Sequence, residues 1–293
     1  MKISIAGMFG ATSRSGRSHI VDYVQAAEEL GFRALYVPEH VVFFSSYESK
    51  YPYTPDGSPA WSADTGIFDP LFICQVGAMA TTSLTFCTGV LVLPQRPALL
   101  TAKEVLTLDH FSDGRFELGV GSGWSWEEYA ALGVSFDRRG DRMDDYIRAI
   151  RAAWGDQPCA YSGEFVEFAN VVLNPRPVTP GGPPIIVGGS STAAMRRAVK
   201  LGDGWYGWWA GVEIEPHLEQ LRAILASHNR AANSQGFSIR IGLPVGSGDP
   251  ETVAAKIDQA AGLGVDELVL AAPVGTRDPQ ADLARWAEVA GLC

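Results

Sequence analysis

The sequence lacks an apolar run long enough to cross a membrane, and its first ten residues lack the layout of a signal peptide. Only four cysteines occur among 293 residues, at positions 74, 87, 159 and 293, and their spacing matches no metal-binding motif. Scattered cysteines of this kind are typical of reduced thiols. We therefore expect a cytoplasmic protein that binds no metal and enters no membrane.

Positive charge is also scarce, with 23 Lys and Arg against 33 Asp and Glu and a net charge of −10. This balance argues against nucleic acid as a partner. A zinc motif, a Walker loop and a GxSxG elbow are all missing from the sequence. Any anionic ligand would have to be held locally, by backbone amides or by a few arginines.

What is present is a regular alternation of short apolar segments and amphipathic ones. Eight segments are predicted to be strands, each followed by a helix, and they begin near Ile3, Ala34, Thr85, Phe116, Ile185, Trp205, Ile239 and Glu267. Extra material follows the second and fourth units, and no long linker divides the chain. This pattern is typical of a (β/α)₈ TIM barrel, and we interpret residues 1–293 as one domain. An open doubly wound sheet is the alternative, because periodicity alone does not show closure.

Residues 84–128 contain two of these strands, at 84–93 and 115–120, and a helix at 98–111 between them. Gly89 interrupts the first strand, and Gly121 follows the second. Strand, helix and strand at this spacing form a parallel crossover unit. Ligands of such sheets bind beyond the carboxyl ends of the strands. Both glycines therefore indicate one site.

Pro38, Glu39 and His40 directly follow the second predicted strand. A histidine can exchange a proton near neutral pH, and Glu39 could orient it or act as an acid. The alternative is a polar strand end that makes only structural hydrogen bonds. The segment 41–68 that follows is aromatic, rich in turn residues and without clear periodicity, and a loop of this length is often a lid.

The sequence Gly188-Gly189-Ser190-Ser191 precedes a predicted helix at 192–201. Glycines allow a ligand to approach the backbone, and free amides at a helix N-terminus favour an anion. The alternative is an ordinary turn in which a serine caps the helix. Tryptophans near strand ends suit a wall for a planar ring, although such residues are more often part of the core. They are Trp124, Trp205, Trp208 and Trp209.

Three segments together resemble the luciferase-like monooxygenase superfamily, whose members bind flavin or deazaflavin in a (β/α)₈ barrel. They are residues 31–40, the 84–128 stretch, and residues 183–189 with 202–205. The sequence TLDHFSDGRFELGVGSGW most resembles the branch that uses the deazaflavin coenzyme F420. The resemblance implies an oxidoreductase that transfers hydride between F420 and a small organic substrate, and we expect a homodimer. An FMN-dependent monooxygenase and a non-catalytic flavin-binding relative remain open.

The resemblance also implies roles for particular residues. His40 and Glu39 would be catalytic, and a cis peptide between Gly89 and Val90 would form a bulge behind the ring. The loop of Gly188, Gly189 and Ser190 would bind the phosphate. Further cofactor contacts are expected from Thr88, Gly121, Gly123, Trp124, Ser191 and Trp205. Trp124 stands where the sugar-phosphate dehydrogenases of this branch have a glutamate, which argues against a sugar phosphate as substrate.

Overall fold

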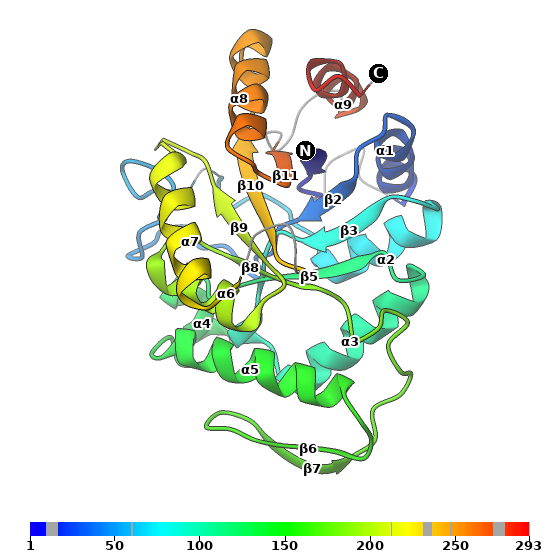
Figure 1. Cartoon of the computed structure of the whole chain (residues 1–293), viewed down its shortest axis with the longest axis vertical. Helices are drawn as coiled ribbons and strands as arrows, with labels where there is room; N and C mark the ends of the chain where they lie inside the picture. The colour runs from blue at the N-terminus through cyan, green and yellow to red at the C-terminus, as the bar shows by residue number, and fades with distance from the viewer. Residues whose placement is uncertain are drawn as a thin grey trace.

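The computed structural model describes residues 1–9, 17–59, 61–211, 213–230, 236–246, 248–271 and 279–292. Eight parallel strands form its centre (Figure 1). They are β1 Lys2–Ala6, β2 Ala34–Val37, β3 Thr85–Thr88, β5 Phe116–Gly121, β8 Ile185–Gly188, β9 Gly204–Trp208, β10 Ser238–Pro244 and β11 Glu267–Ala271. Each begins at, or one residue before, the position that the sequence predicts.

The sheet closes on itself. Its order is β3-β2-β1-β11-β10-β9-β8-β5, and β3 also pairs with β5 through Phe86 opposite Phe116 and Cys87 opposite Glu117. The predicted (β/α)₈ barrel is therefore confirmed, and the open sheet is excluded. Among the described residues, no helix is long and apolar enough to cross a bilayer.

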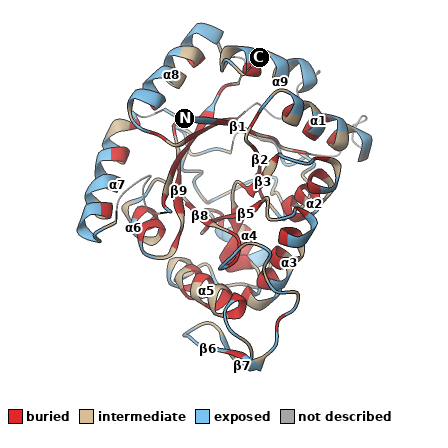
Figure 2. Ribbon diagram, turned by 45° about the vertical axis from the view of Figure 1, so that its right-hand side comes forward, coloured by how far each residue is buried: buried red, intermediate tan, exposed pale blue. Residues whose placement is uncertain are grey.

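Helices surround the barrel, and Figure 2 shows buried residues on the strands and on the helix sides that face them. The helices are α1 Arg17–Glu29, α2 Pro70–Ala80, α3 Ala98–Phe111, α5 Arg139–Trp154, α6 Thr192–Leu201, α7 Glu215–Ser227, α8 Pro250–Gly262 and α9 Pro279–Val289. Side-chain caps begin several of them: Asp69 accepts from the amide of Leu71, and Asp249 accepts from the amide of Thr252. The sequence also predicts a helix over residues 216–233; in the structure this helix is α7 and ends at Ser227, and residues 231–235 lie outside the described part.

Two insertions depart from the regular alternation. After β5 the chain forms a short helix, α4 Trp126–Ala131, and after α5 it forms an antiparallel hairpin of β6 Cys159–Ser162 and β7 Glu167–Val171. The hairpin lies outside the barrel next to α5 (Figure 1). The strand predicted at 84–93 is broken after Thr88, resumes as β4 Leu91–Val92 and continues into a short 3₁₀ helix, η1 Leu93–Gln95.

The amino ends of the strands are closed by a charged cluster, which we call the floor and define as Arg33, Glu117, Arg240 and Glu267. Arg33 binds Glu117 at 2.5 Å and Glu267 at 3.0 Å, and Arg240 pairs with both glutamates. Charges buried in this way are stable only when they are paired and hydrogen-bonded. Two cations and two anions balance one another here, so the floor carries no net charge.

Candidate active site

The residues predicted for the site come together at the carboxyl ends of the strands, which we call the mouth. His40 follows β2, Gly89 follows β3, Trp124 follows β5 and Ser190 follows β8. Barrel enzymes place their chemistry at this end. The floor and the mouth therefore occupy opposite ends of the same barrel.

The Gly89–Val90 peptide is cis, as the resemblance implies. The side chain of Val90 fills the space between β5 and β8. A Cβ on Gly121 would lie 2.6 Å from Val90 Cγ2, and one on Gly188 would lie 2.7 Å from Val90 Cγ1. The structure thus explains Gly121 and Gly188 by the room that they leave for Val90.

Two other residues that were predicted to contact the cofactor are instead hydrogen-bonded or packed within the protein. Thr88 is fully buried, and its hydroxyl donates to the carbonyl of Gly119 at 2.6 Å. Gly123 has a φ of +66°, and a Cβ there would lie 2.7 Å from Val92. Both residues shape the mouth, and neither side-chain position is free to contact a ligand.

His40 is held by a carboxylate that the sequence analysis did not name. Its Nδ1 lies 3.2 Å from Oε2 of Glu128, a residue of α4 whose side chain is 2% exposed. Burial alone would raise the pKa of Glu128, but hydrogen bonds from His40 and from the amides of Val41 and Val42 outweigh it and lower the pKa below the ordinary value. Glu128 is therefore an anion at neutral pH, and it orients the ring.

The expectation that Glu39 supports His40 is wrong. Glu39 is almost fully buried and accepts from Arg96 at 2.5 and 2.8 Å and from the amide of Val92 at 2.6 Å. Arg96 also binds Asp69 at 2.5 Å. Burial raises the pKa of Glu39, although Arg96 opposes the shift. The contacts of Glu39 join the end of β2 to β4 and α2, and they make it a structural neighbour of the site.

The segment 41–68 covers the mouth with aromatic rings, as expected for a lid. The ring of Trp61 lies 5.0 Å from that of His40, and Tyr51 lies 5.0 Å from Trp61 and 5.3 Å from Trp124. Tyr53 continues the contact to Trp208 at 6.1 Å. Such spacings are those of ordinary aromatic packing. The lid therefore rests directly on residues of the barrel mouth.

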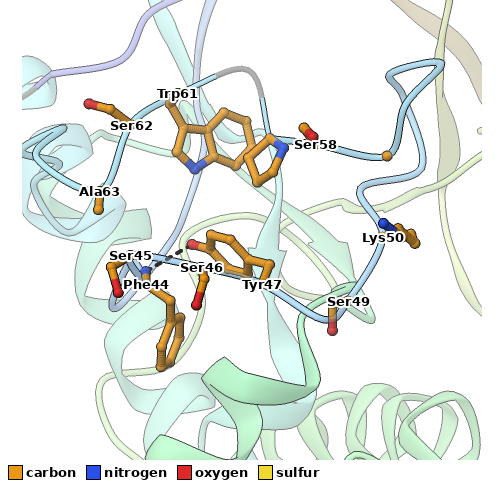
Figure 3. Close-up of a pocket in the computed structure, with 12 residues that line it drawn as sticks. Phe44, Ser45, Ser46, Tyr47, Ser49, Lys50, Ser58, Trp61, Ser62 and Ala63 are labelled. Carbon is orange, nitrogen blue, oxygen red and sulfur yellow. Dashed lines mark hydrogen bonds between the residues drawn. The ribbon is translucent and has the colours of Figure 1, made fainter.

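A cavity of about 390 Å³ lies within the lid. Figure 3 shows Trp61 and Tyr47 among the residues that line it, together with several serines and Lys50. Trp61 belongs both to this cavity and to the ring contacts of His40. A small molecule in this cavity would thus be separated from His40 by the indole ring of Trp61.

Three buried polar atoms at the mouth and in the lid have no hydrogen-bond partner within the described residues. They are Nε1 of Trp61, Nε1 of Trp124 and Oγ of Ser190. A buried donor without a partner is costly and needs an explanation such as an unseen ligand or water. The mouth therefore offers donors that a polar ligand could satisfy.

The loop at residues 188–191 shows both features that its sequence suggested, a serine that caps the helix and a polar group that could bind an anion. Ser191 caps α6 by accepting from the amide of Ala194, which is the ordinary turn. Gly189 has a φ of +121°, and its amide donates to Tyr206. Ser190 Oγ, at the entrance to the ten-residue α6, makes no hydrogen bond of regular geometry, although it interacts with the hydroxyl of Tyr53 in the lid. Of this loop, Ser190 is the side chain available to an anion.

Trp205 lies behind the loop and does not form a wall of the mouth. It is fully buried, and its Nε1 donates to the carbonyl of Gly189 at 2.8 Å. The tryptophan at the mouth on this strand is Trp208, which is partly exposed and contacts Tyr53 and Tyr206. Trp205 therefore supports the loop from the layer between the strands and the surrounding helices, on the face of β9 opposite to Tyr206.

Sequence reasoning missed Glu128 and Arg96. Glu128 lies 88 residues from His40, and its neighbour Glu127 is chemically identical, so only the fold distinguishes them. The signal that could have indicated α4 is the pair of acids in its first turn behind the cap Ser125, directly after a predicted strand end. Among the described residues, no group of three or more potential metal ligands is present.

The closed eight-stranded barrel and its lidded mouth place this protein among (β/α)₈ enzymes with a site at the carboxyl ends of the strands. The sequence then identifies the family. The chain belongs to the luciferase-like monooxygenase family, whose model matches residues 2–247.

Relatives of the chain support this membership. An uncharacterized protein of Mycobacterium tuberculosis is 32% identical over 244 residues, which are 83% of each chain. An FMNH₂-dependent dimethylsulfone monooxygenase of Pseudomonas fluorescens is 31% identical over 218 residues, 71% of this chain and 58% of that protein. An F420-dependent secondary alcohol dehydrogenase, solved with an F420–acetone adduct, shares the fold with a TM-score of 0.77 at 14% identity, covering 99% and 98% of the two chains. The chain is thus a member of the luciferase-like oxidoreductases, and an F420-dependent enzyme shares its fold.

Proposed function

We propose that the protein is an F420-dependent oxidoreductase that exchanges hydride with a small organic substrate at the mouth. The observation that carries this proposal is His40, held at Nδ1 by the buried Glu128 among aromatic rings. Its Nε2 has no hydrogen-bond partner within the described residues. An imidazole with one nitrogen fixed and the other available is suited to proton transfer.

The mouth fits a planar ring with an anionic tail. Gly89 and Val90 form a partly exposed shelf, and Trp124 and Trp208 stand at the ends of β5 and β9, the strands on either side of β8. Ser190 Oγ supplies an unpaired donor at the N-terminus of α6, where an anion is favoured. Bound there, F420 would supply a ring carbon that exchanges hydride with a substrate carbon.

The residues of the chain would handle the proton. His40 Nε2 would accept the proton of a substrate hydroxyl as that group becomes a carbonyl, and would return it in the reverse direction. Glu128 would stabilise the imidazolium that forms, because its carboxylate lies 3.2 Å from Nδ1. The lid would exclude water, which strengthens these electrostatic interactions.

An FMN-dependent monooxygenase is the second candidate. It is favoured by the sequence identity of 31% to the FMNH₂-dependent enzyme of Pseudomonas fluorescens. The same shelf, phosphate loop and histidine would serve a flavin. The proposal of F420 rests on the resemblance of residues 107–124 and on a mouth arranged for proton transfer at a substrate oxygen.

Titration of the purified protein with F420 and with FMN tests the proposal. We expect tighter binding of F420, followed by turnover when F420 is added with secondary alcohols or reduced F420 with ketones and enones. Tighter binding of FMN, with consumption of dioxygen after reduction, would establish the second candidate. Binding without turnover in either assay would indicate a non-catalytic relative. The expected homodimer and the cytoplasmic location stay predictions, and sedimentation velocity tests the first.

A further inference from the structure

Glu128 uses its two carboxylate oxygens on two different parts of the site. Oε2 lies 3.2 Å from Nδ1 of His40. Oε1 accepts from the amide of Val41 at 2.7 Å and from the amide of Val42 at 3.4 Å. These amides are the first two of the lid. One buried side chain therefore contacts both the candidate proton-transfer residue and the start of the segment that covers it.

The chemistry of the two oxygens dictates the tautomer of His40. A backbone amide can only donate, so Oε1 must accept from the lid. Oε2 of an ionised carboxylate can also only accept, so neutral His40 must carry its proton on Nδ1. The other nitrogen, Nε2, is then an acceptor. The network leaves one tautomer that satisfies every partner.

The neighbouring acid has a different role in the same helix. Oε1 of Glu127 accepts from the amides of Glu48 and Ser49 at 2.7 and 2.9 Å, and the amide of Trp126 donates to Ser49 Oγ. Glu127 thus holds the middle of the lid, and among the described residues it makes no hydrogen bond with His40. The two adjacent glutamates provide a natural pair for separating lid anchoring from histidine positioning.

We propose that Glu128 is a positioning residue that fixes His40 in the Nδ1–H tautomer and makes this tautomer depend on the lid being docked on α4. When the amides of Val41 and Val42 occupy Oε1, the carboxylate is held with Oε2 on the imidazole. When the lid leaves, Glu128 loses two of its three hydrogen bonds and its orientation is no longer fixed. The geometry of the structure carries this inference, and its consequence for catalysis rests on the proposed function.

The substitution Glu128→Gln tests the coupling sharply. The amide of glutamine has one oxygen and one NH₂ group. If the NH₂ faced the lid, it would meet two backbone donors, so the lid contact directs the oxygen to Val41 and Val42. The NH₂ then faces His40 Nδ1, which must accept. We expect neutral His40 to change to the Nε2–H tautomer.

Long-range ¹H–¹⁵N NMR of the histidine side chains reads the tautomer directly, without cofactor or substrate. The protein has five histidines, and the spectrum of His40→Gln identifies the signals of His40. At about pH 8, above the usual titration range of histidine, the wild type should show a protonated Nδ1 and a bare Nε2. Glu128→Gln should reverse the two, and Glu127→Gln should leave them unchanged.

A wild-type His40 with its proton on Nε2 would overturn the proposal, and this measurement needs no variant. An unchanged tautomer in folded Glu128→Gln would overturn it as well. Hydrogen exchange tests the part played by the lid. The amides of Val41 and Val42 should stay protected in Glu128→Gln and exchange at least tenfold faster in Glu128→Ala. In Glu127→Ala the faster exchange should appear at Glu48 and Ser49.

Turnover separates this inference from the proposed function. With F420 and an accepted substrate, Glu128→Gln should lower kcat by at least tenfold, and Glu127→Ala should change KM more than kcat. A reversed tautomer with unchanged kcat would leave the positioning inference intact and remove His40 from the proposed mechanism. A tautomer that does not reverse would remove the inference and leave the proposed function standing.

Discussion

The floor and the mouth both contain buried polar groups, but the two ends differ in whether the protein itself pairs those groups. In the floor, each charged group of Arg33, Glu117, Arg240 and Glu267 faces a partner of opposite sign, and Ser4 donates to Glu267 at 2.5 Å. At the mouth and in its lid, donors of Trp61, Trp124 and Ser190 are buried without partners in the part of the chain that is described.

The difference follows from the tasks of the two ends. Polar groups that serve the fold alone must be satisfied by the fold, since an unpaired buried group costs about 1–3 kcal/mol. Groups that serve a ligand can be left unpaired, because the ligand completes them. We infer that substitutions in the floor act mainly on stability, and that substitutions at the mouth act mainly on binding and turnover.

The largest effect is expected from Glu117→Ala. This change removes the carboxylate that lies between the guanidinium groups of Arg33 and Arg240. Breaking a buried ion pair typically costs about 3–5 kcal/mol, because the remaining charge has no partner. Urea unfolding at neutral pH should show a loss of this size. A loss below about 1 kcal/mol would mean that the floor does not stabilise the fold.

The same carboxylate should make stability depend on pH. Burial alone would raise the pKa of Glu117, but Arg240 and Arg33 outweigh it and lower the pKa from 4.5 to about 2. A lowered pKa in the folded state stabilises the protein above the unfolded value, and this stability is lost as the pH falls through the folded value. Between about pH 4.5 and 2, wild-type stability should therefore fall more steeply than that of Glu117→Gln. Parallel curves would argue against the shift.

His40→Ala should have the next largest effect, and this effect should appear in turnover and not in the free energy of unfolding. Positioned acid–base groups contribute ~10²–10⁴-fold, so turnover should fall by roughly 10²-fold or more while cofactor affinity stays within a few fold. A purely structural histidine would lower the melting temperature and leave turnover per folded molecule nearly unchanged. Both quantities should be measured on one preparation.

Ser190→Ala should have the smallest effect and should appear only in binding. A hydrogen bond to a charged group contributes about 1.5–3 kcal/mol, so cofactor affinity should fall by at least about tenfold. Within the described residues the serine would lose only its interaction with the Tyr53 hydroxyl, and stability should change by less than about 0.5 kcal/mol. Fluorescence titration and urea unfolding measure the two quantities. An equal loss of binding free energy and of stability would mean that Ser190 stabilises the fold and does not bind the cofactor.

Gly189→Val would be a poorer test of the same loop. Gly189 has a φ of +121°, which side-chain-bearing residues rarely adopt, and a Cβ there would lie 3.0 Å from Ala194. Weakened binding in that variant could follow from a distorted loop. Ser190→Ala changes the ligand contact and leaves the backbone as it is.

The fold was largely predictable because its signals are local. Apolar strands, helical periodicity and capping residues are short-range patterns, and α3 and α6 occupy the predicted residues. Eight such units in one chain then favour a barrel. Closure was not predictable in this way, because it depends on the pairing of β3 with β5.

The site was predictable by position and only partly by role. Residues at the carboxyl ends of parallel strands had to meet, so His40, Val90 and Ser190 were assigned to one end from the sequence. The partners of these residues were not predictable. Glu39 adjoins His40 in sequence and binds Arg96, whereas Glu128 is distant in sequence and binds His40.

The sequence by itself therefore determined the order of the elements, the repeated strand–helix units and the end at which the site lies, whereas closure of the sheet came from the pairing of β3 with β5. The tertiary structure decided which carboxylate meets the histidine, which glycines make room for Val90 and which donors remain unpaired. The physical reason is that the interactions differ in how far apart in the sequence their partners lie. Secondary structure and strand direction depend on neighbours within a few residues, whereas hydrogen-bond partners and packing depend on distances between segments that only the closed barrel brings together.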